Sequence, residues 1–202
     1  MYTVPPGIVM WGGGGGQGPK YPAGTYSVTV RSGSWSQTQS FRLNTDPRFL
    51  PIMTDAESVE QFKLANEIGS QIKSLYDNLA RIRDVKKQTS EIAQKAGANA
   101  SVTAASKLLT DKLVSIEGDL TQLQGEGGQD ALNFPGRMDN QLIALYQNIV
   151  GTERHMGTTI RERYKDLKPQ ADQLMLRATT ALKTDVAAFN TVATGAGLEA
   201  IK

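Results

Sequence analysis

The sequence predicts an α+β protein, in which a small, incomplete antiparallel β segment is followed by an antiparallel bundle of three to four helices. Residues 1–50 hold most of the Gly and Pro clusters, both tryptophans, and short runs of β-branched or aromatic residues. Residues 51–202 are instead rich in Leu, Ile, Ala, Gln and Lys at helical spacing. We therefore expect a β segment over 1–50 and a helical bundle over 51–202.

A hairpin is expected in the middle of the β segment. Residues 25–31 alternate apolar with polar side chains, which is typical of a strand with one buried face. Ser32-Gly33-Ser34 predicts the turn, and residues 35–43 predict the returning strand. Gln37 and Gln39 interrupt the apolar face of that second strand.

A third short strand is predicted at 8–11, where an apolar run is ended by the five glycines Gly12–Gly16. Gly13, Gly15 and Gly18 match the spacing of a dinucleotide-binding fingerprint. That site needs a helix N-terminus directly after the glycines, and Pro19-Lys20-Tyr21-Pro22 follows instead. We interpret the glycines as a flexible or partner-fitted loop.

The first two helices have recognisable ends. Thr54 and Glu57 form a capping box that should begin a long helix, which Gly97-Ala98-Asn99 should end. Ser101 is the expected N-cap of the next helix, and Gly125–Gly128 should end it. Apolar residues three and four apart predict the inward stripes of these helices, namely Ala65, Ile68, Ile72, Leu75, Leu79 and Ile82, then Leu109, Leu113, Ile116, Leu120 and Leu123.

Two further helices complete the predicted bundle. A loop through 133–136 leads to a shorter helix that carries Met138, Leu142 and Ile149 inward. A second capping box, Thr159 to Glu162, should begin the last helix. Pro169 lies inside this last pattern and predicts a kink or a break. Short loops between the helices favour an antiparallel arrangement.

Composition leaves little catalytic chemistry available. The chain has no cysteine and one histidine, His155, which excludes disulfides, cysteine nucleophiles and cysteine-ligated metals. His155 lies between the last two predicted helices, with Glu153 and Glu162 as its nearest acidic neighbours in sequence, and it matches no metal-ligand motif. We expect a surface or helix-terminal histidine, and neither a metal nor a cofactor.

Two carboxylate pairs are the candidates for a glycosidase site. Glu117 and Asp119 are two apart on a predicted helix and should point to different faces, whereas Glu126 and Asp130 flank glycines in a loop. Nothing in the sequence holds either pair across a sugar at the separation that hydrolysis requires. Solvated surface acids are the expected role, and we predict that the chain is not an enzyme.

Charge and hydropathy limit the partners. A net charge of +2 is too weak to favour nucleic-acid binding. Basic clusters at 81–87 and 161–168 are interrupted by acids, so they predict solvated helix faces, with an acidic partner or anionic headgroups as the alternative. The sequence contains no run of about 18 apolar residues, so no transmembrane helix is predicted. The first residues also lack the pattern of a signal peptide.

Three short strands cannot complete a two-sheet sandwich, which needs roughly seven. The side chains of the predicted inner face would then require cover from preceding strands, the helices or another chain, and an unpaired apolar edge is a template for strand addition. The residues of this face are Trp11, Tyr26, Val28, Val30, Trp35 and Phe41.

Several short motifs stand out along the chain, at residues 6–11, 18–19, 22–28, 41–43, 46–48 and 132–142. Together they resemble the C-terminal part of large exported bacterial proteins that carry sortilin-like (BNR-repeat) β-propellers. Members are often labelled glycosyl hydrolase or photosystem stability/assembly factor-like, and in them an Ig-like domain is followed by a helical domain. The pentaglycine and Pro169 depart from the family pattern, and the propeller is absent.

The resemblance implies a partial Ig-like β segment and a periplasmic or extracellular location. We therefore expect a non-catalytic structural subunit that docks on a larger protein complex, including one embedded in a membrane such as a photosynthetic reaction centre, as a membrane-extrinsic accessory subunit. The alternative is a secreted carbohydrate- or peptidase-associated binding module. The candidate partner-binding residues are Trp11, Tyr26, Trp35, Phe41 and Phe134.

Overall fold

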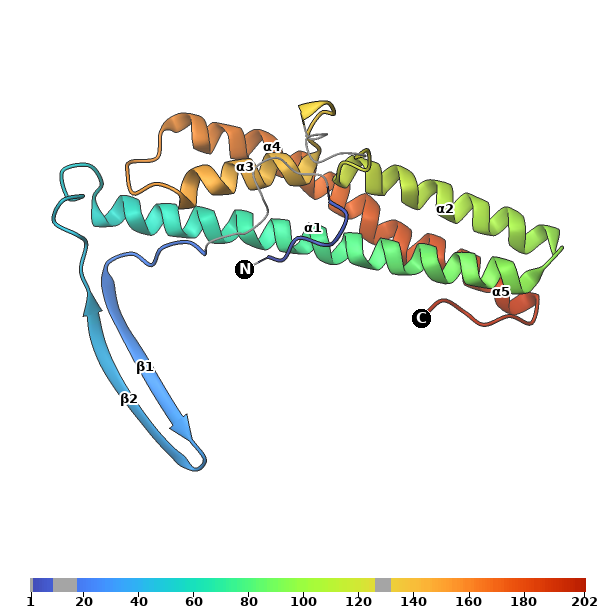
Figure 1. Ribbon diagram of the computed structural model, residues 1–202, viewed down its shortest axis with the longest axis horizontal. Coiled ribbons are helices and arrows are strands. Elements are labelled where there is room, and N and C mark those ends of the chain that lie inside the picture. The colour runs from blue at the N-terminus through green and yellow to red at the C-terminus, as the bar shows by residue number, and fades with distance from the viewer. Residues whose placement is uncertain (1, 9–17, 126–131) are drawn as a thin grey trace.

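The computed structural model describes residues 2–8, 18–125 and 132–202. It confirms the α+β class, with a two-stranded antiparallel sheet followed by a helical bundle (Figure 1). The predicted strand at 8–11 lies almost wholly outside the described residues, and Ile8 itself belongs to no strand. The elements are β1 (Gly24–Ser32), β2 (Trp35–Leu43), α1 (Asp55–Ala96), α2 (Ala100–Leu120), α3 (Met138–Val150), α4 (Thr158–Thr180), the π-helical segment η2 (Ala181–Asp185) and α5 (Val186–Gly195).

The bundle is organised along α1, which runs its whole length (Figure 1). α2 and α3 follow one another along α1 in the opposite direction, so each covers one part of it (Figure 1). α4, η2 and α5 then return along the full length and pack against both shorter helices (Figure 1). The apolar stripe predicted for α1 forms the centre of this core, where its residues are all at most 1% exposed.

Both predicted ends of α1 are confirmed. The Glu57 amide donates to the Thr54 hydroxyl (3.2 Å), and the Thr54 amide donates to the Glu57 carboxylate (2.8 Å). At the other end Gly97 has a φ of 57°, a conformation that side chains with a Cβ rarely adopt. Local chemistry therefore fixes the length of this helix.

Both predicted ends of α2 are wrong. Asn99, not Ser101, caps α2 by accepting from the Val102 amide (3.1 Å). α2 ends at Leu120, ahead of the glycines, because Thr121 turns away and its hydroxyl donates to Asp139 on α3 (2.7 Å). Leu123, predicted inward, is consequently exposed.

The last helix also differs from its prediction. It begins at Thr158, and its N-cap residue is Gly157, which has no side chain to cap the helix. The expected capping box at Thr159 therefore does not form. Pro169 does not break the helix, which continues to Thr180. The departure from α-helical hydrogen bonding comes later, in η2, where the backbone widens over five residues.

Segments at both ends of the described chain join the bundle, which the sequence did not predict. Tyr2 is 5% exposed and packs against Tyr76 on α1 and Tyr146 on α3, with ring centroids 6.2 and 5.6 Å away. Ile201 is buried, and its amide donates to the Asn190 side chain on α5 (2.8 Å). The Arg83 guanidinium donates to the Pro6 carbonyl (2.7 Å), which holds the N-terminal segment along α1.

Candidate functional site

The hairpin has two chemically distinct faces. Its strands pair in an unbroken register that includes Tyr26 with Phe41 and Val30 with Gln37. Because side chains alternate along a strand, the register places one set of apolar residues together. This apolar hairpin face consists of Tyr26, Val28, Val30, Trp35, Phe41 and Leu43, with Gln37 and Gln39 between them.

The apolar hairpin face is exposed, although the sequence predicted a buried one. Val28, Val30, Trp35 and Phe41 are each 50 to 55% exposed. The reason is the position of the hairpin, which leaves the bundle near the start of α1 and projects to one side, clear of the helices (Figure 1). No helix or strand of the described residues covers this face. A two-stranded sheet alone is marginally stable in water. A contiguous apolar surface that is left exposed on such a sheet is typical of an interaction site.

The opposite face of the hairpin is polar and positively charged. The hydroxyls of Thr29 and Thr38 are 2.8 Å apart across the strands. Arg31 and Arg42 lie at opposite ends of this face, and Arg42 donates to the Asn44 side-chain oxygen (3.1 Å). Neither arginine forms an ion pair within the described parts of the chain.

Aromatic rings attach the base of the hairpin to the bundle. Phe41 and Tyr26 stack with centroids 6.0 Å apart, Tyr26 meets the edge of Tyr21 at 5.6 Å, and Tyr21 contacts Phe62 on α1 at 5.0 Å. The Tyr26 hydroxyl donates to the Pro22 carbonyl (2.7 Å). The base is therefore held in place, while the far end with Trp35 extends into solvent.

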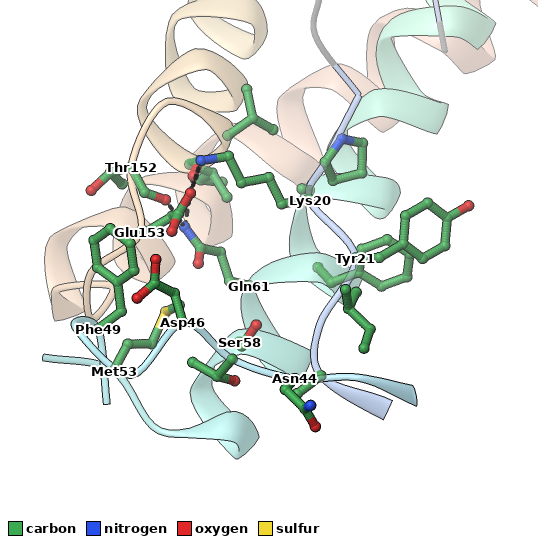
Figure 2. Close-up of a pocket in the computed structure, with 18 residues that line it drawn as sticks. Lys20, Tyr21, Asn44, Asp46, Phe49, Met53, Ser58, Gln61, Thr152 and Glu153 are labelled. Atoms are coloured by element: carbon green, nitrogen blue, oxygen red, sulfur yellow. Dashed lines mark hydrogen bonds and ion pairs between the residues drawn. The ribbon is translucent and has the colours of Figure 1, made fainter. Parts of the chain in front are cut away.

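A cavity of about 340 Å³ lies where the hairpin base meets α1 and the link between α3 and α4 (Figure 2). An ion pair between Lys20 and Glu153 crosses one side of it (Figure 2). The Gln61 amide donates to the carbonyls of Ile149 (2.7 Å) and Thr152 (3.0 Å). Asp46 is hydrogen-bonded by Arg48, which lowers the pKa of this carboxyl to about 2. Of these contacts, the Lys20–Glu153 ion pair joins the segment before the hairpin to the bundle, and the Gln61 bonds hold the link between α3 and α4 against α1.

The candidate residues do not all meet. Tyr26, Trp35 and Phe41 share the apolar hairpin face. Phe134 is half-buried in the loop between α2 and α3, away from the hairpin. Trp11 lies outside the described residues.

The carboxylates considered for hydrolysis are separated. Glu117 is 3% exposed and accepts from Arg83 and Lys86 on α1, at 2.7 Å each. Burial raises the pKa of Glu117, but the hydrogen bonds from these cations outweigh burial and leave the pKa below its usual value. Asp119 instead pairs with Arg177 on α4 (2.8 Å), so the two acids face different neighbours, as expected. The prediction of a solvated surface acid is wrong for Glu117, because the packing of α2 on α1 buries it against two cations. Glu126 and Asp130 lie outside the described residues.

His155 lies on the surface in the link before α4, as expected, and its acidic partner comes from a distant part of the sequence. Its Nδ1 is 2.6 Å from Oε1 of Glu57, the third residue of α1 and the acid of its capping box. The Thr54 amide and hydroxyl, followed by His155, lower the pKa of Glu57 to about 2. His155 therefore links the segment just before α4 to the first turn of α1.

One buried polar cluster was missed by the sequence analysis. Asp139, in the first turn of α3, is fully buried and accepts from Thr121 (2.7 Å) and the Asn140 amide (2.7 Å). The Tyr76 hydroxyl lies 3.5 Å away. Burial raises the pKa of Asp139 to about 6 in spite of these hydrogen bonds. An acid in the first turn of a helix is ordinary in sequence, so nothing local marked this one as buried.

The described ranges contain neither a cluster of metal ligands nor a helix suited to a bilayer. No three acidic or histidine side chains are grouped as metal ligands there. Within residues 2–8, 18–125 and 132–202, no helix combines the length and apolar character needed to cross a bilayer. No known protein family, curated protein or solved structure matches this chain.

Proposed function

We propose that the protein is a non-catalytic structural subunit that docks on a larger protein assembly through its hairpin, with the helical bundle as a rigid body behind it. The observation that supports this most is the exposed apolar hairpin face. Five of its six apolar side chains, all except the half-buried Tyr26, are exposed and contribute little to folding unless something covers them. An assembly that covers this face would gain their burial as binding energy.

A periplasmic or extracellular location, and attachment to a membrane-embedded complex such as a photosynthetic reaction centre, rest on the family resemblance alone. We propose them as the specific form of this docking function. Extraction separates this form from others, because a membrane-extrinsic subunit leaves washed membranes with high salt or alkali and without detergent. Release only by detergent would contradict it.

The docking function is tested by isolating the protein from native membranes in mild detergent and identifying what co-purifies. The informative variant is the double change Val28→Thr and Val30→Thr, which keeps β-branched shape but removes apolar surface. The matched control is Ser27→Ala with Thr29→Ala on the opposite face of the same strand. We expect at least tenfold weaker association for the valine variant and unchanged association for the control. A monomeric protein whose hairpin resists protease in isolation would refute the proposal.

Carbohydrate binding is the second candidate, because Trp35 is 53% exposed near the hairpin turn, as a sugar-stacking ring must be. Retardation of the protein in polysaccharide-containing gels would support it, provided that Trp35→Ala abolishes the retardation. Equal mobility with and without polysaccharide would exclude it.

A further inference from the structure

We propose that the hairpin docks by strand addition, in which β1 or β2 pairs with the open edge strand of a separate partner protein that carries Asp or Glu beside Arg31 or Arg42. This inference rests on the docking function proposed above. It adds the mode of recognition and the chemistry of the partner.

Both edges of the hairpin are open for backbone pairing. Each strand is nine residues long, and the register runs without a bulge from Gly24 opposite Leu43 to Ser32 opposite Trp35. Neither strand contains proline or lysine. In the part of the chain that the structure describes, no third strand joins them. Natural edge strands are usually shortened, bulged, covered or charged against pairing, and these edges have few such features.

The two hairpin arginines define the charge of the partner. Lys20, Arg31 and Arg42 are the only charged residues between positions 18 and 45, and Lys20 is already paired with Glu153. Arg31 and Arg42 have no carboxylate partner among the described residues, whereas Arg83, Lys86 and Arg177 do; Lys63 and Lys95 on α1 are likewise without an ion pair, but they do not lie beside an open strand edge. The planar guanidinium fits a carboxylate with two parallel hydrogen bonds.

The placement of the arginines favours an adjoining strand. Arg31 and Arg42 lie on the polar face, opposite the apolar hairpin face. A strand that pairs with β1 or β2 would place the side chains on its polar face directly beside Arg31 or Arg42, where opposite charges stabilise a sheet. The side chains on its other face would extend the apolar hairpin face. The expected partner strand therefore alternates apolar with polar residues that include acids.

Other occupants fit these observations less well. A second copy of the hairpin would bring no carboxylate to Arg31 or Arg42, because neither strand contains Asp or Glu. A bilayer that buried the apolar face would leave Arg31 and Arg42 pointing away from the anionic headgroups. The described ends of this chain are held elsewhere, since Tyr2 is buried against α1 and α3, and the Lys202 amide donates to Gln88 on α1 (3.0 Å).

The first test uses the full chain in its native cells with a photoreactive phenylalanine derivative at Val30, and at the exposed Leu176 on α4 as a control. Cross-links from position 30 to an edge strand of another protein, with Asp or Glu in that strand, are expected. Position 176 should give none to that strand. Cross-links from position 30 to a second copy, to lipid or to the bundle of the same chain would each overturn strand addition.

The second test exchanges charges with the cross-linked partner. Arg31→Glu with Arg42→Glu should weaken co-purification at least tenfold, and changing the acids of the partner strand to lysine should restore it. Lys63→Glu with Lys95→Glu is the matched reversal on exposed sites of α1 and should have no effect. Wild-type association of the arginine variant would refute the role of the acids. Co-purification without any cross-link from position 30 refutes strand addition but leaves the docking function standing, whereas no co-purification refutes both.

Discussion

Asp139 and Glu117 are buried carboxylates with opposite electrostatic environments. Glu117 meets two cations from α1, and its pKa is lowered. Asp139 is surrounded by neutral groups, the hydroxyls of Thr121 and Tyr76 among them, and its pKa is raised to about 6. Burial penalises both charges, and the presence of a counter-charge decides which form each acid favours.

Asp139→Asn should change how stability depends on pH. The folded protein holds the Asp139 proton up to about pH 6, whereas the unfolded chain releases it near 3.8. Ionisation therefore costs stability as pH rises from 3.8 to 6, by about 3 kcal/mol at 1.4 kcal/mol per unit. The asparagine variant lacks this cost. Its amide oxygen can accept from the Asn140 amide while its NH₂ group donates to the Thr121 hydroxyl, so both hydrogen bonds are kept.

We expect the variant to unfold at higher urea concentration than wild type at pH 7 and at a similar one near pH 4. Urea unfolding followed by circular dichroism between pH 4 and 7.5 measures the difference. A constant difference across this range would contradict a raised pKa for Asp139.

Glu117→Gln should destabilise the bundle at neutral pH, because it leaves Arg83 and Lys86 without their shared counter-charge. Both cations are partly exposed, so we expect about 1–3 kcal/mol rather than the full cost of a buried unpaired charge. Since the pKa of Glu117 is lowered, the loss should be present above its ordinary value of 4.5 and shrink as the wild-type carboxyl protonates below it. Glu162→Gln, at an exposed position of α4, is the control. Equal unfolding free energies for the two variants at pH 7 would contradict the role given to Glu117.

Secondary-structure elements were predictable where adjacent residues suffice to define them. The capping box at Thr54 and the glycine at 97 needed only local chemistry, and both ends of α1 were correct. The end of α2 was not, because Thr121 leaves the helix to bond with Asp139, a residue 18 positions away. The two faces of the hairpin followed from its alternation, but their exposure depends on what covers the sheet, which no strand encodes.

Pro169→Ala should stabilise α4. Pro169 is exposed within a continuous helix, where it lacks an amide proton to donate to the Lys165 carbonyl. Alanine restores that bond and helix propensity, although the unfolded chain regains some freedom. We expect a gain of about 1–3 kcal/mol in chemical denaturation. Gln170→Ala, at the exposed neighbouring position, should change the free energy of unfolding by only about a few tenths of a kcal/mol. Loss of stability on Pro169→Ala would mean that packing in the bundle requires the proline geometry.

The molecule consists of two parts, a packed helical bundle and a projecting hairpin. The core is formed by the helices together with Tyr2 and Ile201 from the two ends of the described chain. No local pattern in the sequence marks Tyr2 as buried, because its cover comes from α1 and α3. Docking and stability should therefore respond to changes in different parts of the chain.

Replacing residues 24–43 with a short Gly-Ser linker tests this separation. Gly24 and Leu43 are paired across the sheet, so a few residues span the gap without moving the bundle. The hairpin contacts α1 through aromatic residues at its base, and Tyr21 and Phe62 are both retained. We expect the thermal unfolding midpoint, followed by helical circular dichroism, to change by only a few degrees, while association with the assembly is lost.

Tyr2 supplies the matched comparison for that experiment. Tyr2→Ala should lower stability by about 3 kcal/mol, because it opens a cavity between α1 and α3, and it should leave association intact at temperatures where the bundle is folded. Tyr2→Phe should be neutral or stabilising, since the Tyr2 hydroxyl is buried without a hydrogen-bond partner among the described residues. If the linker variant instead unfolds as early as Tyr2→Ala, the hairpin is part of the cooperative core, and its exposed face cannot be explained by docking alone.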